Sequence, residues 1–496
     1  MGLLVGHDLG THANKAVLLD ESGRILAKSV EPYGIQLSGH DRAEQDPEVW
    51  WQAVCLCTRR LLEQSGRAGH EVDAVGFAGQ MLALVPMDAE GRPTRPAISW
   101  LDSRAEVQAA RVIRMFGGRT IVSMLAGAIP SGKDLVCKIA WLREEEPEVF
   151  ERTALFGDAT SYLVTRATGS LSIDVTCAAG TGMLDPKSRS WSSLLAWLSR
   201  FPLAKAGTPR ECTEPVGTLT AEAAEALGLS TRAIVVAGLA DIPAAALGSG
   251  CVSPNDAHIY LGTSGWLGIT TATPAASPEH GIAALPWTVP GTSLTIAEME
   301  NAGSCLDWAM RQVLFREGPQ TAETYRAFEA LAVTSEPGAN DLFFLPWLYG
   351  ERSPFPNERL RGGWLGASLT TRSADLARSV FEGVSYNLAW SLQAMAERGV
   401  RPTSLAALGG GALSDLWLQS MADASGLPVL RLAEPRTAGA VGAALCAGVG
   451  AGKVASLGAI KELVQWERRF EPDTAAHALH RERLPRFARL AGWMGP

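Results

Sequence analysis

A short turn near the start of the chain has the residue types that bind phosphate. The stretch GHDLGTH places Asp8, Gly10 and Thr11 between two alternating apolar runs, which predict two adjacent strands. Backbone N–H groups at such a glycine, together with the threonine hydroxyl, form a small anion-binding concavity. A carboxylate at its edge can hold Mg²⁺ through water, and Lys15 adds a positive charge. The turn is a candidate phosphate site, and a β-turn without function is the alternative.

The same pattern occurs past the midpoint of the chain. Gly262, Thr263 and Ser264 lie between two predicted strands in YLGTSGWLGI, without an acidic residue. Two such turns facing each other would contact the phosphates of a nucleotide from both sides. A glycine-rich segment, residues 409–415, follows a third predicted strand. Its glycines allow the backbone to approach an adenine or ribose closely, and close packing of a helix on a sheet is the alternative.

An aspartate follows a buried strand late in the first half of the chain. Asp241 comes directly after AIVVAGLA and shortly before Pro243. A carboxylate on a loop that leaves a buried strand can accept the proton of a substrate hydroxyl. The same position suits the start of a helix, because proline favours the first helical turn. Asp241 is therefore a candidate general base, and capping is compatible with that role.

The stretch GAIPSGKD, residues 127–134, is only superficially like a nucleotide-binding P-loop. A P-loop needs Ser or Thr after Gly-Lys to hold Mg²⁺, and this chain has Asp134 there. The preceding residues 120–126 are compatible with a strand, and the next helix is expected to begin with Asp134 as its cap. Nucleotide phosphates are therefore expected elsewhere.

The elements that must position these groups alternate between strands and helices. A strand–turn–strand unit opens each half of the chain, which indicates two related domains, residues 1–250 and 251–496. The Ala- and Gly-rich run AGAVGAALCAGVGAG is typical of close helix packing, and the tail from about residue 455 is expected to be helical. Long amphipathic helices are predicted over residues 47–66, 103–118 and 373–399.

Composition limits the class of protein. A chain of 496 residues is too long for one core. The net charge is −8 and is distributed along the chain, which argues against a surface that binds nucleic acid. No apolar run approaches the roughly 20 residues that span a bilayer, and the start of the chain has no secretory signal. Eight dispersed cysteines without a CxxC pair fit the reduced thiols of a cytoplasmic protein.

Taken in order, these motifs resemble the FGGY carbohydrate kinases of the actin/hexokinase/heat-shock-ATPase superfamily, and among them the xylulokinases. The resemblance runs from Gly6 to about Gly452. It implies an α/β fold of two ribonuclease-H-like, actin-like ATPase domains with a nucleotide and sugar cleft between them. ATP and Mg²⁺ are the implied cofactors, a small sugar or polyol is the implied partner, and a homodimer is the default assembly. The segments that carry the resemblance include AEQDPEVWWQA, AGQM, RPAISWLDSRA, KIAWLREEEPEVF, DVTCAAGTGMLD, GLADIPAAALGSG, YLGTSG, FLPWLYGERSPFPN and GGGALSDLWLQSMAD.

The resemblance also assigns roles to particular residues. Asp241 matches the catalytic aspartate, and Asp8 and Asp241 are the expected ligands of Mg²⁺ through water. The residues expected to bind the nucleotide are Asp8, Gly10, Thr11, Lys15, Gly262, Thr263, Ser264, Gly303, Asp307, Gly410, Gly411, Ala412 and Asp415. The residues expected to shape the sugar pocket are Gln80, Met81, Leu82, Trp100, Asp102 and Asp241.

The chain departs from the xylulokinase pattern at the sugar. Leu82-Ala83 stands where those kinases usually have His-Gly, Ile242 stands in place of Asn, and Thr160-Ser161 stands in place of Lys-Asp. Losing a hydrogen-bond partner for a buried hydroxyl costs about 1–3 kcal/mol. The expected reaction is ATP-dependent phosphorylation of a small sugar, first a ketopentose such as xylulose. Another sugar or polyol (ribulose, erythritol or glycerol) is the alternative, followed by a non-catalytic sugar-sensing protein or an actin-like ATPase.

Overall fold

The computed structural model describes residues 2–126, 129–313 and 320–493. The chain divides into two compact units. Unit 1 comprises Met1–Val252, Leu285–Ser293 and Thr437–Val464, and unit 2 comprises Ser253–Ala284, Leu294–Arg436 and Gln465–Pro496. No helix in the described part of the chain is both long and apolar enough to cross a membrane.

Unit 1 is built around a mixed sheet. In spatial order its strands are β14 (Pro215–Thr218), β15 (Ile234–Val236), β6 (Val72–Gly79), β1 (Leu3–Leu9), β2 (Ala13–Asp20) and β3 (Ile25–Pro32), and β16 (Leu239–Ala240) also pairs with β6. β1 runs antiparallel to β2 and parallel to β6, and both β15 and β16 run parallel to β6. The carboxyl ends of β1, β6 and β16 therefore lie at one edge of the sheet.

Helices cover both faces of this sheet. The helices of unit 1 are α1 (Pro47–Ser65), α2 (Glu106–Met115), α3 (Arg119–Ala126), α4 (Leu135–Glu145), α5 (Pro147–Arg152), α6 (Ala159–Thr168), α7 (Val175–Ala179), α8 (Ser193–Ser199), α9 (Ala221–Leu227), α10 (Asp241–Gly248), α15 (Ala438–Gly450) and α16 (Ile460–Leu463). On one face, Trp50 and Trp51 of α1 share a core with Val5 and Phe77. The loops contain a three-stranded sheet of β4 (Gln36–Ser38), β5 (Arg42–Gln45) and β8 (Ala97–Ile98). They also contain short strand pairs: β7 (Val85–Met87) with β9 (Leu155–Gly157), β10 (Ile173–Asp174) with β13 (Pro209–Arg210), and β11 (Leu184–Asp185) with β12 (Ser190–Trp191).

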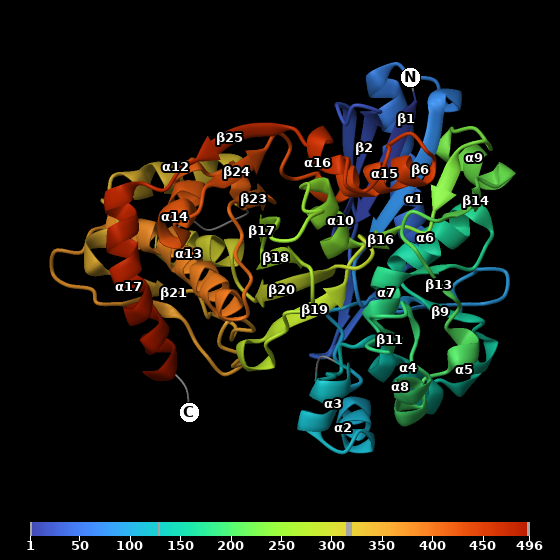
Figure 1. Cartoon of the computed structure of the whole chain (residues 1–496), viewed down its shortest axis with the longest axis horizontal. Helices are drawn as coiled ribbons and strands as arrows, with labels where there is room; N and C mark the ends of the chain where they lie inside the picture. Colours follow the sequence, from blue (N-terminus) through green and yellow to red (C-terminus); the bar gives the residue numbers. More distant parts are fainter. Residues whose placement is uncertain (1, 127–128, 314–319, 494–496) are drawn as a thin grey trace. The chain divides into compact units, whose positions relative to one another are not determined.

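The small-residue helix α15 packs on the opposite face of the unit 1 sheet, although it comes late in the sequence. Figure 1 shows it in red beside the blue strands β1 and β2. A Cβ added to Gly6 would lie 2.0 Å from the carbonyl oxygen of Ala440, and one added to Gly76 would lie 1.9 Å from that of Ala443. The glycines on the strands and the small residues on the helix therefore permit this close approach.

Unit 2 repeats this strand order and has one further strand at an edge. Its sheet contains β19 (Ile282–Pro286), β20 (Ser293–Met299), β18 (Gly265–Thr271), β17 (Ala257–Leu261), β23 (Leu405–Leu408), β24 (Val429–Leu432) and β25 (Trp466–Phe470), with β21 (Phe343–Leu345) and β22 (Gly363–Leu365) as a separate pair. β17 runs antiparallel to β18 and parallel to β23, as β1 does to β2 and β6. The helices are α11 (Gly303–Val313), α12 (Ala322–Val333), α13 (Ser373–Glu397), α14 (Asp415–Ser425) and α17 (Thr474–Trp493).

Two predicted elements differ from the structure. Residues 120–126 belong to the helix α3, not to a strand, because a short apolar run has no period that separates a strand from a helix. The tail is not wholly helical, since β25 lies between α16 and α17 and pairs with β24. The sequence of β25, WERRF, is mostly charged and exposed, which is typical of an edge strand. It therefore lacks the alternation of apolar and polar residues from which inner strands are predicted.

The P-loop-like stretch begins outside the described residues, since Gly127 and Ala128 are not among them. As expected, Asp134 is the N-cap residue of α4. Its carboxylate accepts hydrogen bonds from the backbone N–H of Ser131 at 2.6 Å and from the Ser131 hydroxyl at 2.9 Å. The predicted domain boundary between residues 250 and 251 is a position in the linear sequence and stays a prediction. Unit 1 is not one continuous segment, because it also includes α15 and α16 from late in the chain.

Candidate active site

Two of the predicted acids lie at the same edge of the unit 1 sheet. Asp8 on β1 pairs with Ala78 from one side of β6, and Leu239 on β16 pairs with Ala78 from the other side. Asp241 follows β16 and is the first residue of α10. β1 and β16 are therefore separated by two strand spacings, roughly 10 Å, with the two carboxylates at the carboxyl ends of their strands.

Asp8 lies in a close-fitting environment. Lys15, its partner across the β1–β2 pair, brings Nζ to 3.5 Å from Asp8 Oδ2. A Cβ added to Gly439 in the first turn of α15 would lie 2.7 Å from the same oxygen, so only glycine leaves room for this carboxylate. Asp8 and Asp241 supply carboxylate oxygens, the ligand type that Mg²⁺ prefers. The donor set at this edge of the sheet therefore fits a hydrated Mg²⁺.

The first turn, residues 8–11, is bonded to the segments that are predicted to form the sugar pocket. Gly10 N–H donates to the carbonyl of Ala13 at 3.0 Å and closes the turn. Trp100 donates its indole N–H to the hydroxyl of Thr11 at 2.8 Å. Gln45 donates its amide to the carbonyl of Thr11 at 2.8 Å, and Gln80 donates to Gln45 Oε1 at 2.9 Å. Thr11, Trp100 and Gln80 therefore lie in one hydrogen-bond network, and Gln45 joins them.

Gln80 has an oxygen with no partner in the described part of the chain. Its side chain is 1% exposed, and its Oε1 atom accepts no hydrogen bond from the described residues. Buried polar atoms are nearly always hydrogen-bonded. Among the described residues, Gln80 therefore keeps one unused hydrogen-bond acceptor inside this network.

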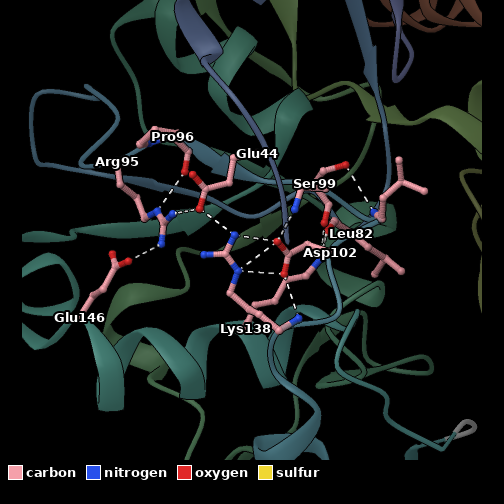
Figure 2. Close-up of polar contacts among 11 residues, drawn as sticks. Glu44, Leu82, Arg95, Pro96, Ser99, Asp102, Lys138 and Glu146 are labelled. Carbon is pink, nitrogen blue, oxygen red and sulfur yellow. Dashed lines mark hydrogen bonds and ion pairs between the residues drawn. The ribbon is translucent and has the colours of Figure 1, made fainter. Parts of the chain in front are cut away.

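Lys138 holds the two predicted sugar segments together. Its Nζ donates to the carbonyl of Leu82 and to the carbonyl of Ser99, each at 2.8 Å, and Figure 2 shows these groups gathered around it. The Lys138 side chain is fully buried, and this burial lowers its pKa to about 7, against the attraction of Asp102 and Asp134. Leu82 has a φ of 61°, an unusual value for a branched side chain, so the bond to its carbonyl helps to maintain that backbone.

Asp102 is fully buried and makes its hydrogen bonds within the protein. Its carboxylate accepts two bonds from Arg104 Nε and one from Nη2, and the backbone N–H of Ala43 donates to it at 2.7 Å. Arg104 is also ion-paired with Glu44. Figure 2 shows Glu44 beside Arg95. The role of Asp102 in the sugar pocket stays a prediction, and its observed contacts support the loop from within. Met81 lies between Gln80 and Leu82 and is partly exposed.

Asp241 is positioned by the backbone on either side of it. Its Oδ1 accepts the backbone N–H of Ile242 at 2.9 Å. Ile242, which stands where xylulokinases have asparagine, is 9% exposed. Gly238 in the preceding loop has a φ of 82° and passes close to the carbonyl of Phe77. The sharp turn at Gly238 brings the chain back to pair with β6 at β16, directly before Asp241.

The predicted nucleotide residues of unit 2 form a second group. Gly303 N–H donates to the carbonyl of Gly262 at 2.7 Å, and Ser304 N–H donates to that of Thr263 at 3.1 Å, so the start of α11 lies on the second turn, residues 262–264. Gly262 N–H donates to the carbonyl of Ser264 at 3.0 Å. The glycine-rich segment also reaches this end of β17. Gly409 and Gly411 both pack against Leu261, and Gly410 and Ala412 lie with them in the turn before α14.

Two predicted nucleotide residues are engaged by other side chains. Asp307 accepts a hydrogen bond from the Tyr325 hydroxyl. Asp415 is ion-paired with Arg431 at 2.7 Å and with Arg468. Their contacts with a nucleotide stay predictions.

Sequence reasoning missed Gln45 and Lys138. Both residues lie inside segments that carried the family resemblance, and Lys138 interrupts the apolar run LVCKIAWL. A single lysine within a buried helix is a usable signal, because a buried cation needs partners. Its partners, two backbone carbonyls, could not be foreseen from the side chains.

Comparison with known proteins defines the class. Residues 3–248 match the N-terminal domain of the FGGY family of carbohydrate kinases, and residues 257–451 match its C-terminal domain. The chain belongs to the FGGY family of carbohydrate kinases. This confirms the predicted family, the enzyme class and the two-domain α/β fold of the actin-like ATPase type.

The chain is also similar to individual xylulose kinases. The chain is 33% identical to the xylulose kinase of Escherichia coli (strain K12), over 98% of each chain. It is 29% identical to the xylulose kinase of Bacillus subtilis (strain 168), over 92% of this chain and 90% of that one. The crystal structure of xylulose kinase from Rhodospirillum rubrum matches with a TM-score of 0.88 and 27% identity, over 99% of this chain and 98% of that one.

Proposed function

We propose that this kinase transfers the γ-phosphoryl group of ATP to a hydroxyl of a ketopentose, with D-xylulose as the first candidate. The relatives named xylulose kinase support the substrate class. The observation that carries the reaction is the position of Asp8 and Asp241 at one edge of the unit 1 sheet, Asp8 on β1 and Asp241 directly after β16, the two strands that flank β6. The mostly buried cysteine thiols support a cytoplasmic location, and a homodimer stays the expected assembly.

Asp241 is the general base in this proposal. It accepts the proton of the sugar hydroxyl while that oxygen forms a bond to the γ-phosphorus and the bond from phosphorus to the departing ADP oxygen breaks. Asp8 and Asp241 are the residues that would hold Mg²⁺, which, when bound, neutralises charge on the phosphates. The first turn and Lys15 orient the phosphates in unit 1. Gly262, Thr263, Ser264, Gly303 and the segment 410–412 are assigned to the nucleotide in unit 2.

Gln80, Trp100 and Leu82 are assigned to the sugar. The unpartnered Oε1 of Gln80 is the acceptor for one sugar hydroxyl. Leu82 and Ile242 offer no polar group at two positions where the resemblance predicts one. This apolar character favours a second candidate substrate, a sugar or polyol with fewer or differently placed hydroxyl groups.

The test is ADP release with Mg-ATP across a panel of ketopentoses, aldoses and polyols, with Asp241→Asn measured in parallel. Asparagine preserves the shape of the side chain and cannot act as the base. We expect Asp241→Asn to bind sugar and ATP and to lose at least 99% of turnover, since general-base catalysis contributes about 10²–10⁴-fold. Near-normal kcat in this variant would contradict the assignment. Strong turnover on a polyol with weak turnover on D-xylulose would select the second candidate.

A further inference from the structure

The backbone directly before Asp241 is bonded on both sides to buried threonine hydroxyls. Thr176 on α7 accepts the N–H of Ala240 at its Oγ1 atom, at 2.9 Å. Thr160 on α6 donates its hydroxyl to the carbonyl of Leu239 at 3.0 Å. Leu239 and Ala240 are the whole of β16. The two bonds engage the C=O and the N–H of one peptide unit, Leu239–Ala240, and therefore fix that unit directly before the predicted base.

The hydroxyl of Thr176 has a defined orientation. Its one hydrogen is donated to Asp174 Oδ1 at 2.5 Å, which leaves a lone pair for the N–H of Ala240. Asp174 Oδ1 also accepts the backbone N–H groups of Thr176 at 2.8 Å and Cys177 at 3.1 Å. Asp174 is fully buried and caps α7, so it cannot reorient freely. A buried carboxylate thus orients a hydroxyl, and the hydroxyl orients the backbone.

Asp241 depends on this backbone. Ala240 is the N-cap residue of α10, and its side chain makes no capping hydrogen bond. The carboxylate of Asp241 accepts the N–H of the next residue, Ile242, so its direction follows the first turn of the helix. A misplacement of about 1 Å at a reacting group can cost about 10²-fold in rate.

We propose that Thr176, oriented by Asp174, is a positioning residue for Asp241. This inference rests on the proposed function, in which Asp241 is the base. It assigns a role in turnover to two residues of the DVTCAAGTGMLD segment that lie outside the predicted site. Neither residue is assigned a contact with the sugar or the nucleotide, so their effect is expected in kcat and not in either KM.

The test compares two variants of Thr176. Thr176→Val keeps the size of the side chain, removes the hydroxyl and leaves the Ala240 N–H without its acceptor. We expect kcat to fall at least 10-fold, with the KM values for sugar and ATP within about threefold of the wild type. Thr176→Ser retains the hydroxyl, and we expect it to restore kcat to within about threefold of the wild type.

A matched control separates positioning from loss of stability. Thr58→Val removes a fully buried hydroxyl in α1 that contacts His7 and the carbonyl of Val54, away from Asp241. We expect its melting temperature to fall by an amount similar to that of Thr176→Val, with kcat close to the wild type. Equal losses of kcat in the two variants, or equal losses of kcat in the Val and Ser variants, would overturn the inference.

The double variant Thr176→Val/Asp241→Asn, together with the two single variants, distinguishes a failure of the positioning role from a failure of the proposed base. If Thr176 acts through Asp241, the valine substitution has little further effect once the base is absent. An inactive Asp241→Asn variant together with a fully active Thr176→Val variant would reject only the positioning role. A fully active Asp241→Asn variant would reject the proposed base and, with it, the positioning role.

Discussion

Trp100 donates its indole N–H to the hydroxyl of Thr11 over 2.8 Å, which joins a predicted sugar segment to the first turn. A second connection runs from Gln80 through Gln45 to the carbonyl of the same threonine. The two kinds of predicted site in unit 1 therefore share one hydrogen-bond network. We expect this network to couple the binding of sugar to the position of the phosphates.

Trp100→Phe tests this coupling. The substitution keeps an aromatic ring and removes the N–H donor, and a hydrogen bond of this kind is worth about 0.5–1.5 kcal/mol. We expect the KM values for both sugar and ATP to rise by about 2–10-fold. Steady-state ADP release measures both values. Trp197→Phe, at a side chain that is 75% exposed, is the control and should leave both values unchanged. A rise confined to one substrate would contradict the coupling.

Leu82→His tests how the departure from the xylulokinase pattern at this position affects kcat/KM for D-xylulose. The φ of 61° at this position is strained for leucine, whereas histidine is several-fold enriched in that region of backbone conformation. Histidine also restores a hydrogen-bonding group at the sugar. We expect kcat/KM for D-xylulose to rise by about tenfold, which corresponds to about 1.4 kcal/mol. Leu82→Phe adds a ring without a hydrogen-bonding group and is the control. An equal gain in both variants would show that polarity is not the cause.

The sequence predicts where Asp8 and Asp241 lie in unit 1 because both residues are local to strand ends. Asp8 lies in a strand–turn–strand pattern and Asp241 follows a buried strand, and carboxyl ends of parallel strands meet at one sheet edge. The position of α15 could not be predicted in the same way. Its run of Ala and Gly indicates close packing, but the glycines on β1 and β6 that receive it are more than 350 residues earlier in the chain. Only the folded structure pairs them.

Residues that act through the backbone were the hardest to foresee. Thr176 and Lys138 bond to N–H or carbonyl groups, which every residue has, so side-chain types alone give no sign of the partner. β25 was missed for a different reason, because an exposed edge strand of charged residues has no buried face to set an apolar period.

We expect Lys138 to make the free energy of unfolding depend on pH above pH 7. Its pKa is about 7 in the folded protein, because burial disfavours the charge, and about 10.5 when unfolded. Between these values the unfolded chain binds more protons, so this group makes the free energy of unfolding rise with pH, by up to about 1.4 kcal/mol per pH unit. Lys138→Met should remove this contribution. Urea unfolding of both proteins at pH 7, 8 and 9 measures the difference, with Lys133→Met as a control at a partly exposed neighbour. Parallel curves for wild type and Lys138→Met would contradict the prediction.

Asp174 should have the opposite effect at acidic pH. Burial, followed by repulsion from the equally buried Asp158, raises the pKa of Asp174 from 3.8 to about 6. Between these values the folded protein binds more protons than the unfolded chain, so this group makes the free energy of unfolding fall as the pH rises. Asp158→Asn removes the repelling charge, and the fall should then shift to lower pH and become smaller. Urea unfolding between pH 4 and 7 tests this, and Asp46→Asn, at an exposed helix cap, is the control. If the difference between wild type and Asp158→Asn does not vary with pH in this range, the two carboxylates do not interact as their burial implies.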